Sequence, residues 1–567
     1  MNQMMKKLAS ALLLALAMST SHTASAQGFQ NPIIPGFYPD PSVLRVGEDY
    51  YLINSTFQFF PGVPLWHSRD LVHWEQLGNV LDRSIQLPLN GSDCWSGIYA
   101  PTIRFHEGRF YMITTNVGHV GNFVVMADVP TGAKAEDYPQ LFREGKIHWG
   151  EPIWLTQEGI DPSLLFEDGK CYMTSNPDGA IWLCELDADT GEQLTESRMI
   201  WEGTGGRHPE APHLYKINGW YYLMLAEGGT EQGHMVTMAR SRDPYGPYED
   251  CPHNPILYHW RKVAQDNPIQ GTGHADLVQA HDGSWWMVNL GFRTTSGNNH
   301  HLGRETFLAP VTWDADGWPV VNGNGTESLN MQVQTLPQVS YPSLPEREDF
   351  SRPLGPEWIY LCNPDSSNYS VGMNGLRLRA VPGLPLTTVG KTISFVARRQ
   401  QHIECQVETE ITLETNDREN SLYCETGITL YATAASHYDV YLTALEDGRT
   451  AMRLRCKLED MVSHQREIIL PKNLHTASVR ITSDTDRYTF SYSIDGGKHW
   501  IEMGKLNTRY LSSECAGGFT GTVIGLYAVQ PNPNCKSRIE GRFSYFDYKA
   551  IDSSKKAKKE GNLFKKS

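Results

Sequence analysis

Three acidic residues stand at matching places in a repeated sequence pattern, and together they suggest acid–base chemistry. Asp40 and Asp161 each begin an Asp-Pro-Ser segment, and Glu210 directly precedes an Ala-Pro-His segment. Cleavage of an acetal needs one carboxylic acid that protonates the leaving oxygen and one carboxylate on the opposite face. Carboxylates that share a partly desolvated pocket raise one another's pKa, which supplies a protonated acid at neutral pH. Asp-Pro-Ser is also a common turn at the start of a strand, but three acids in register favour the catalytic interpretation.

The pattern that carries these acids occurs five times along the chain. The five segments align without gaps over their first dozen residues, at steps of 60, 61, 50 and 64 residues. Each reads as a short strand, a turn rich in Gly and acidic residues, and an aromatic strand, which is typical of a β-hairpin. A repeat of this length with some four strands is typical of a propeller blade. The repeats begin at Asp40, Ala100, Asp161, Ala211 and Ala275.

These repeats predict an all-β chain with a five-bladed β-propeller over residues 27–335. A Pro-containing linker is predicted over 336–345, and alternating strand patterns without the repeat predict a β-sandwich over 346–550. Equivalent positions in a ring of blades face the same axis. We therefore expect the three acids to meet in one central pocket, together with His274, which directly precedes the fifth repeat.

The N-terminus carries the three parts of an export signal. Lys6 and Lys7 are followed by the apolar run 8–18 and by the small-residue sequence Ala24-Ser25-Ala26. This order predicts a signal peptide over 1–26 and a periplasmic or secreted protein. The apolar run is too short to span a bilayer, so no membrane insertion is expected. The basic C-terminal end, 551–567, is predicted to be a disordered tail.

The charge and the cysteines exclude several classes of function. The 567-residue chain has a formal net charge of −15, which argues against a nucleic-acid partner and raises no objection to a neutral substrate. Its ten cysteines form no C-x-x-C pair, so a zinc or redox motif is not indicated, while disulfides stay open. His300 and His301 lie in a Gly/Asn-rich loop without a partner at metal-ligand spacing. Motifs for serine hydrolases, P-loops and zinc peptidases are absent from the sequence.

Aromatic residues near the repeat heads favour a sugar substrate. Phe57 follows the first repeat and Trp95 lies five residues before the second. Sugars present apolar C–H faces that pack against rings, while Arg binds their hydroxyls. For most of the other aromatic residues, packing within the blades is the better interpretation.

Several ordered motifs resemble glycoside hydrolase family 43. Within that family, the chain resembles the β-xylosidase/α-L-arabinofuranosidase group with a C-terminal β-sandwich, which implies a concanavalin-like jelly roll for that domain. The motifs are Pro35-Gly36-Phe37-Tyr38-Pro39-Asp40-Pro41-Ser42, Ser55-Thr56-Phe57, Phe60-Pro61-Gly62, Gly159-Ile160-Asp161-Pro162-Ser163, Glu210-Ala211-Pro212-His213 and Phe519-Thr520-Gly521.

The resemblance implies an inverting, exo-acting hydrolase whose chemistry requires no cofactor. Asp40 matches the general base that activates water, and Glu210 matches the general acid. Asp161 matches the carboxylate that orients the acid and tunes its pKa. Ala211 is a departure, because relatives often have Gly at this place, and it makes the sugar preference less certain than the fold.

The same resemblance implies the residues that bind the substrate. Phe57 and Trp95 match the lining of the terminal-sugar subsite, and Arg304 matches an arginine that reads hydroxyls. His274 matches a central histidine near a possible structural Ca²⁺ held through waters. Phe519 is the candidate for a sandwich residue that reaches into the site.

These expectations give a function with stated alternatives. The first is release of terminal β-D-xylose from the non-reducing ends of xylo-oligosaccharides or xylan, as plant cell-wall substrates. An α-L-arabinofuranosidase, or a bifunctional enzyme, is the alternative. A propeller that binds glycans without cleaving them is a minor alternative, because it would need none of the three acids. The oligomeric state stays open.

Overall fold

The computed structural model describes residues 28–260 and 267–551. The signal peptide predicted at 1–26 and nearly all of the tail predicted at 551–567 lie outside the described residues. Within the described ranges, α-helix is confined to the short segments α2 (Tyr138–Arg143) and α3 (Ser513–Ala516). No helix there is long and apolar enough to cross a membrane. The prediction of an all-β protein is confirmed.

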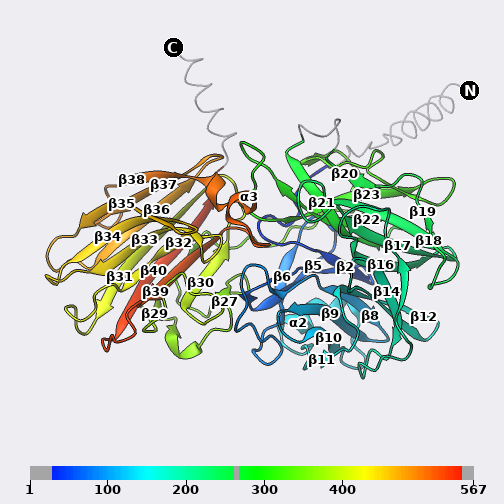
Figure 1. Cartoon of the computed structure of the whole chain (residues 1–567), viewed down its shortest axis with the longest axis horizontal. Helices are drawn as coiled ribbons and strands as arrows, with labels where there is room; N and C mark the ends of the chain where they lie inside the picture. The colour runs from blue at the N-terminus through cyan, green and yellow to red at the C-terminus, as the bar shows by residue number, and fades with distance from the viewer. Residues whose placement is uncertain (1–27, 261–266, 552–567) are drawn as a thin grey trace, which may run out of the picture.

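The N-terminal half folds into five antiparallel sheets, one for each repeat (Figure 1). The first blade contains β2 (Ser42–Val46), β3 (Asp49–Ile53), β5 (Gly62–Ser68) and β6 (Glu75–Leu81). The second contains β8 (Thr102–His106), β9 (Arg109–Val117), β10 (Gly121–Asp128) and β11 (Ile153–Trp154), with β7 (Gly97–Ile98) also paired to β9. The third contains β12 (Ile160–Glu167), β13 (Lys170–Asn176), β14 (Ile181–Leu186) and β15 (Arg198–Trp201). The fourth contains β16 (Glu210–Ile217), β17 (Trp220–Glu227), β18 (Met235–Ser241), β19 (Glu249–Asp250) and β20 (Leu257–Tyr258), and the fifth contains β21 (Ile269–Gln279), β22 (Trp285–Arg293), β23 (Glu305–Trp313) and β24 (Pro319–Val321).

The ring is closed by the segment before the first blade. β1 (Phe29–Gln30) pairs with β25 (Asn330–Met331), and the Asn31 amide exchanges two hydrogen bonds with the backbone of Leu308 on the fifth blade. The apolar residues of neighbouring blades pack between the sheets. The predicted five-bladed propeller is confirmed. Four repeat heads lie within two residues of the start of a blade's first strand, and the fifth, Ala275, lies within β21.

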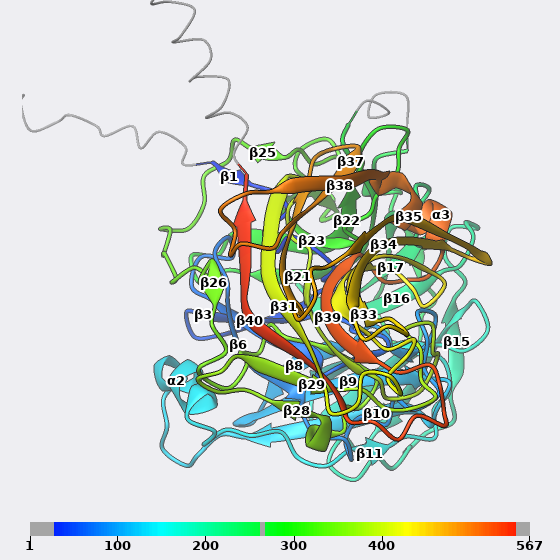
Figure 2. The ribbon, with the colours of Figure 1, turned by 90° about the vertical axis from the view of Figure 1, so that its left-hand side faces the viewer.

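The C-terminal half is a sandwich of two sheets (Figure 2). Alternating residues of its strands pack into one core, as the period-2 pattern predicts. One sheet contains β26 (Arg347–Glu348), β28 (Tyr369–Ser370), β29 (Leu376–Arg379), β31 (Cys405–Thr415), β36 (Thr476–Ser483), β37 (Arg487–Ser493), β38 (Ile501–Asn507) and β40 (Ile539–Ala550). The other contains β30 (Ser394–Arg399), β32 (Glu425–Tyr431), β33 (Ser436–Ala444), β34 (Thr450–Leu458), β35 (Met461–Ile469) and β39 (Val523–Val529). The 3₁₀ turns η2 (Ser366–Asn368) and η3 (Thr508–Leu511) belong to this half of the chain, whereas η1 (Ala135–Asp137) belongs to the propeller.

The two domains share a strand pair and an apolar cluster. β4 (Phe59–Phe60) of the propeller pairs with β27 (Tyr360–Leu361) of the C-terminal half. Around this pair, buried Phe37 and Phe57 pack with sandwich residues such as Phe395. This contact fixes the sandwich beside the propeller (Figure 1). All ten cysteines are free thiols in the structure.

Candidate active site

Three repeat heads and the residue before a fourth share an unusual backbone conformation. Asp40, Asp161 and Ala211 have φ values of 52°, 55° and 54°, and His274 has a φ of 44°. Non-glycine residues rarely adopt the left-handed region, which costs of order 1–3 kcal/mol per residue and clusters at functional sites. The pairing of β12, β16 and β21 with the next strand also shifts register at these places. Such bulges re-aim side chains, which is how four blades direct their heads to one place.

Asp40 is held as an ionised carboxylate. Arg304 Nη1 donates to Asp40 Oδ1 at 3.0 Å, and the Ser55 hydroxyl donates to Oδ2. His274 Nδ1 lies 3.7 Å from the same Oδ1. Burial by itself would raise the pKa of Asp40, but Arg304 and then His274 and Ser55 outweigh burial and hold that pKa below its ordinary value. A carboxylate in this state can accept a proton from water.

Glu210 is held in the opposite protonation state. Its side chain is 18% exposed and stands at the start of β16. Burial raises the pKa of Glu210 well above its ordinary value, and the charges of Asp161 and Asp40 raise it further, against a smaller effect of Arg304. Burial also raises the pKa of Asp161. Glu210 is thus a group that can donate a proton near neutral pH.

Asp161 is tied to the acid through the backbone. The amide N–H of Ala211 donates to Asp161 Oδ2 at 3.1 Å. This bond places one carboxylate beside the peptide that follows Glu210. The left-handed φ of Ala211 costs a Cβ-bearing residue more than a glycine, and the hydrogen bond from its N–H helps to fix that conformation.

His234 is a residue of this site that the sequence reasoning missed. Its Nε2 lies 3.7 Å from Glu210 Oε1 and has no hydrogen-bond partner, while its Nδ1 lies 3.3 Å from the carbonyl oxygen of Gly271. Burial lowers its pKa to about 3, so the ring is neutral. A proton on Nδ1 that is donated to Gly271 leaves Nε2 as an acceptor that faces Glu210. A Cβ at Gly273 would lie 2.3 Å from this ring, so glycine there makes room for it.

Arg304 joins the base to the sandwich. Besides Asp40, its guanidinium donates to Thr230 Oγ1 at 2.8 Å and to the carbonyl oxygen of Phe519 at 3.1 Å. The side chain is buried between the rings of Phe57 and Phe519, at 5.5 and 5.6 Å from their centroids. Both terminal nitrogens therefore have protein partners, and this network positions Asp40.

The aromatic residues form a wall with contributions from both domains. Phe519 lies 4.9 Å from Trp95 and 5.6 Å from Phe57 between ring centroids. Trp95 is 50% exposed, whereas Phe57 is buried behind the wall. Trp95, Glu210 and Phe519 line a cleft of about 790 Å³, which also contacts Trp260 and His300. A cleft of this size holds several sugar units.

The sandwich reaches the cleft through close backbone contacts. Gly303 has a φ of 86°, and a Cβ there would lie 2.8 Å from the Cα of Gly521. Nearby, Thr522 N–H donates to the carbonyl oxygen of His301 at 2.9 Å. His300 Nδ1 pairs with Glu514 at 2.6 Å. His300 and His301 lie in a loop, as the sequence predicts, but the expectation that such a loop is exposed is wrong, because both side chains are buried at the domain contact.

A second buried carboxylate, Asp276, lies in the propeller centre and was not identified as a site residue from the sequence. It accepts hydrogen bonds from Ser42 at 2.8 Å, from Arg104 at 3.0 Å and from Tyr215 at 2.6 Å. Arg104 in turn donates to Leu164 O of the third blade at 3.1 Å. Against burial, Arg104 and neighbouring polar groups lower the pKa of Asp276 to about 2. This hub links all five blades.

The described residues contain no group of three or more His, Cys, Asp or Glu that could hold a metal directly. Ca²⁺ takes six to eight oxygen ligands, and His274 offers a ring nitrogen beside one carboxylate oxygen. A calcium site made of protein ligands does not fit these residues. A Ca²⁺ held near His274 through waters stays a prediction.

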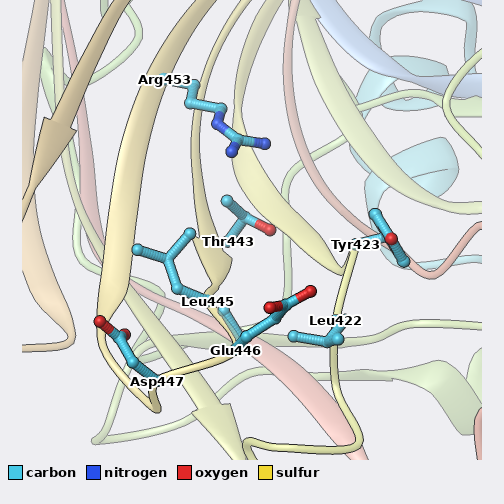
Figure 3. Close-up of a pocket in the computed structure, with 8 residues that line it drawn as sticks. Leu422, Tyr423, Thr443, Leu445, Glu446, Asp447 and Arg453 are labelled. Carbon is cyan, nitrogen blue, oxygen red and sulfur yellow. The ribbon is translucent and has the colours of Figure 1, made fainter.

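Another pocket lies wholly within the sandwich. Figure 3 shows it between Tyr423, Glu446 and Arg453. It contains none of the predicted site residues, and Arg453 already donates to Glu467 at 2.6 Å. The candidate active site is therefore the cleft at the propeller axis.

A carboxyl group of lowered pKa and one of raised pKa, beside an aromatic wall at the heads of propeller blades, fit the acid–base chemistry of a glycoside hydrolase. Residues 29–319 match the family model described as "Glycosyl hydrolases family 43", and residues 347–549 match the "Beta xylosidase C-terminal Concanavalin A-like domain". The chain belongs to glycoside hydrolase family 43, with a concanavalin-like C-terminal domain. The resemblance noted in the sequence is confirmed.

Similar proteins cover the chain almost completely. "Non-reducing end alpha-L-arabinofuranosidase BoGH43B" of Bacteroides ovatus is 39% identical over 97% of this chain and 100% of that protein. "Xylosidase/arabinosidase" of Butyrivibrio fibrisolvens is 35% identical over 92% of this chain and 99% of that protein. The solved xylan β-1,4-xylosidase of Bacillus halodurans C-125 has a TM-score of 0.82 and 31% identity, covering 92% of this chain and 100% of that one.

Proposed function

We propose that this enzyme removes single pentose units from the non-reducing ends of plant cell-wall oligosaccharides, with inversion at the anomeric carbon. The observation that carries the proposal is a pair of neighbouring carboxyl groups whose surroundings shift their pKa values in opposite directions, Asp40 downward through the ion pair with Arg304 and Glu210 upward through burial. Inversion needs such a pair, with room for a water between the base and the sugar.

The proposed mechanism is a single displacement by water. Asp40, held ionised by Arg304 and Ser55, takes a proton from the attacking water. Glu210, kept protonated by burial and by the neighbouring carboxylates, gives its proton to the leaving oxygen. Asp161 orients the acid through Ala211 N–H and keeps its pKa high. We expect the carboxyls of Asp40 and Glu210 to stand about 6.5–9.5 Å apart, as in inverting glycosidases.

The C-terminal domain contributes part of the wall of the proposed sugar subsite. Phe519 contacts Trp95 and accepts the Arg304 hydrogen bond, so the wall of the sugar subsite depends on the second domain. The aromatic wall provides faces for sugar C–H groups. Phe57 supports Phe519 from behind.

β-D-xylose is the first candidate for the sugar that is released, and α-L-arabinofuranose is the second. The names of several relatives support xylose, and BoGH43B, at 39% identity, supports arabinofuranose. Rates on xylobiose and on p-nitrophenyl α-L-arabinofuranoside, measured side by side, decide between them. Absence of turnover on both would contradict the proposal in favour of a binding protein.

The acid role of Glu210 has its own experiment. We expect Glu210→Ala to lose at least ~10²-fold in kcat on xylobiose, but to lose much less on a substrate whose leaving group needs no proton. Equal losses on both substrates would remove Glu210 as the acid.

Export to the periplasm or the medium is also part of the proposal. It is tested by N-terminal sequencing of the mature protein, and an intact Met1 would contradict it.

A further inference from the structure

A second cavity lies at the seam between the domains, apart from the active-site cleft. Its volume is about 570 Å³. The propeller contributes Tyr38 and Trp74, the segment between the domains contributes residues 342–346, and the sandwich contributes Arg398 and Tyr548. β6 and β40, which are both labelled in Figure 2, border it from the two sides.

Arg398 lies in this cavity without a polar partner. It sits on β30 and is 5% exposed, and its side chain makes no hydrogen bond or ion pair within the described part of the chain. Its guanidinium approaches only the rings of Tyr548 and Trp358, at 5.6 and 5.9 Å. Burying a charge without a partner is costly. The buried arginines of the active site and of the hub, Arg304 and Arg104, are both bound to carboxylates.

Glu357 lines the same cavity and is also unpartnered. It is 8% exposed, and no hydrogen bond or ion pair is found for its carboxyl group among residues 28–260 and 267–551. No ion pair within 4.0 Å joins the side chains of Arg398 and Glu357 to each other. None of their polar atoms is among the fully enclosed unpartnered atoms of the described residues, so the cavity presents an accessible donor fork and an accessible acceptor to a ligand.

We propose that this cavity is a second saccharide-binding site for one or two neutral sugar units. A hydroxylated ligand would receive hydrogen bonds from Arg398 and donate them to Glu357, while its C–H faces packed against Trp74 and Tyr548. An anion would find one unpaired cation but would also meet Glu357, so a neutral ligand fits better. The volume is within the range of small-molecule sites, about 300–1,000 Å³.

The cavity shares no lining residue with the active-site cleft, but one residue of its wall contacts the active-site network. Tyr38 forms part of the wall and lies two residues before Asp40, and its N–H donates to Arg304 O at 3.1 Å. The choice of pentosides as probes rests on the proposed function. The existence of a second site does not, because neutral hexosides can be tested in the same way.

The test counts binding sites on the full chain with Asp40→Asn, which should not turn over its ligand. Equilibrium dialysis with xylobiose, L-arabinose and cellobiose is expected to find two binding sites per chain for at least one of them. Arg398→Ala and Glu357→Gln are each expected to weaken the second site at least tenfold and to leave the first. Arg480→Ala is the matched control, since this sandwich arginine stacks on Trp500 outside the cavity. If Arg398→Ala does not fold by circular dichroism, Glu357→Gln carries the test.

Four results would overturn the proposal. One is a single site for all three sugars. A second is two sites that neither Arg398→Ala nor Glu357→Gln weakens. A third is Arg398-dependent binding of galacturonate or phosphate without binding of any neutral sugar. The fourth is a second site that is found only after the chain is truncated at Ile551. That result would mean that the removed residues occupy the cavity in the full chain, since Ala550 lines it. The proposed function fails separately, through loss of turnover in the wild type.

Discussion

Two buried carboxylate centres lie in the middle of the propeller, and they differ in how many hydrogen bonds and opposite charges their carboxyl groups receive. At the active site, three acids lie near one arginine, and the carboxyl group of Glu210 has no hydrogen bond within the described residues. At the hub, a single acid, Asp276, receives hydrogen bonds from Ser42, Arg104 and Tyr215. Both centres are built from residues of the same repeats.

The difference separates the two uses of a buried charge. Full satisfaction lowers the pKa of Asp276 to about 2 and joins the blades, which suits a structural role. Incomplete satisfaction raises the pKa of Glu210 and leaves it ready to give up a proton. Chemistry at the active site thus depends on an electrostatic imbalance that the hub avoids.

The largest effect on activity is expected at Asp40. Asp40→Asn removes the acceptor for the water's proton, so kcat should fall by at least ~10³-fold on xylobiose and on activated substrates alike. Asn leaves the buried Arg304 without its carboxylate, so the Tm should also fall, although by less than in Asp276→Asn, because Arg304 keeps its hydrogen bonds to Thr230 and Phe519. Steady-state rates and thermal unfolding check both statements. Residual turnover above a few per cent would remove Asp40 as the base.

The largest effect on stability is expected at Asp276. Asp276→Asn leaves Arg104 buried without a carboxylate, and breaking a buried pair costs about 3–5 kcal/mol. The propeller's Tm should fall on the order of 10 °C. Ser42→Ala, which removes the hydrogen bonds of one hydroxyl to Asp276 and from Ile103 N–H but keeps the ion pair, is the control and should cost less, about 1–2 kcal/mol. A Tm unchanged in Asp276→Asn would show that the hub does not hold the blades together.

The sequence predicted the active site better than the hub for a physical reason. Asp40 and Asp161 stand at the head of a gapless repeat, so radial symmetry alone places them together. Asp276 stands one place later in its repeat, and its partners Arg104 and Tyr215 are ordinary strand residues whose inward direction depends on the twist of each blade.

His234 shows a second limit of sequence reasoning. It lies on the loop before β18, outside the repeated segment, and it reaches Glu210 only because Gly273 leaves space for the ring. The interdomain cavity was equally hidden, since it needs the packing of two domains. The fold class, by contrast, followed from the spacing of the repeats and from strand alternation.

Neutralising Asp161 should reduce the electrostatic imbalance at the active site. The charge of Asp161 raises the pKa of Glu210, so Asp161→Asn should lower that pKa. The acid must be protonated to act, so activity falls as pH rises through its pKa. The alkaline limb of the kcat/KM profile should therefore move to lower pH, while the acidic limb, set by Asp40, should move less. An alkaline limb that stays in place would assign it to another group.

The smallest effect is expected in the pH dependence of stability that the raised pKa of Glu210 causes. A folded-state pKa raised above the unfolded value contributes stability that is complete below the unfolded pKa and is lost as pH rises through the folded pKa. Glu210→Gln cannot ionise and avoids that loss. Its Tm should therefore exceed the wild-type Tm by a margin that grows from acidic to alkaline pH. Glu107→Gln at an exposed turn is the control and should show no such growth. A Tm difference between Glu210→Gln and the wild type that does not change with pH would mean that the pKa of Glu210 is not raised in the folded protein. The contrast between the two carboxylate centres would then rest on Asp276 alone.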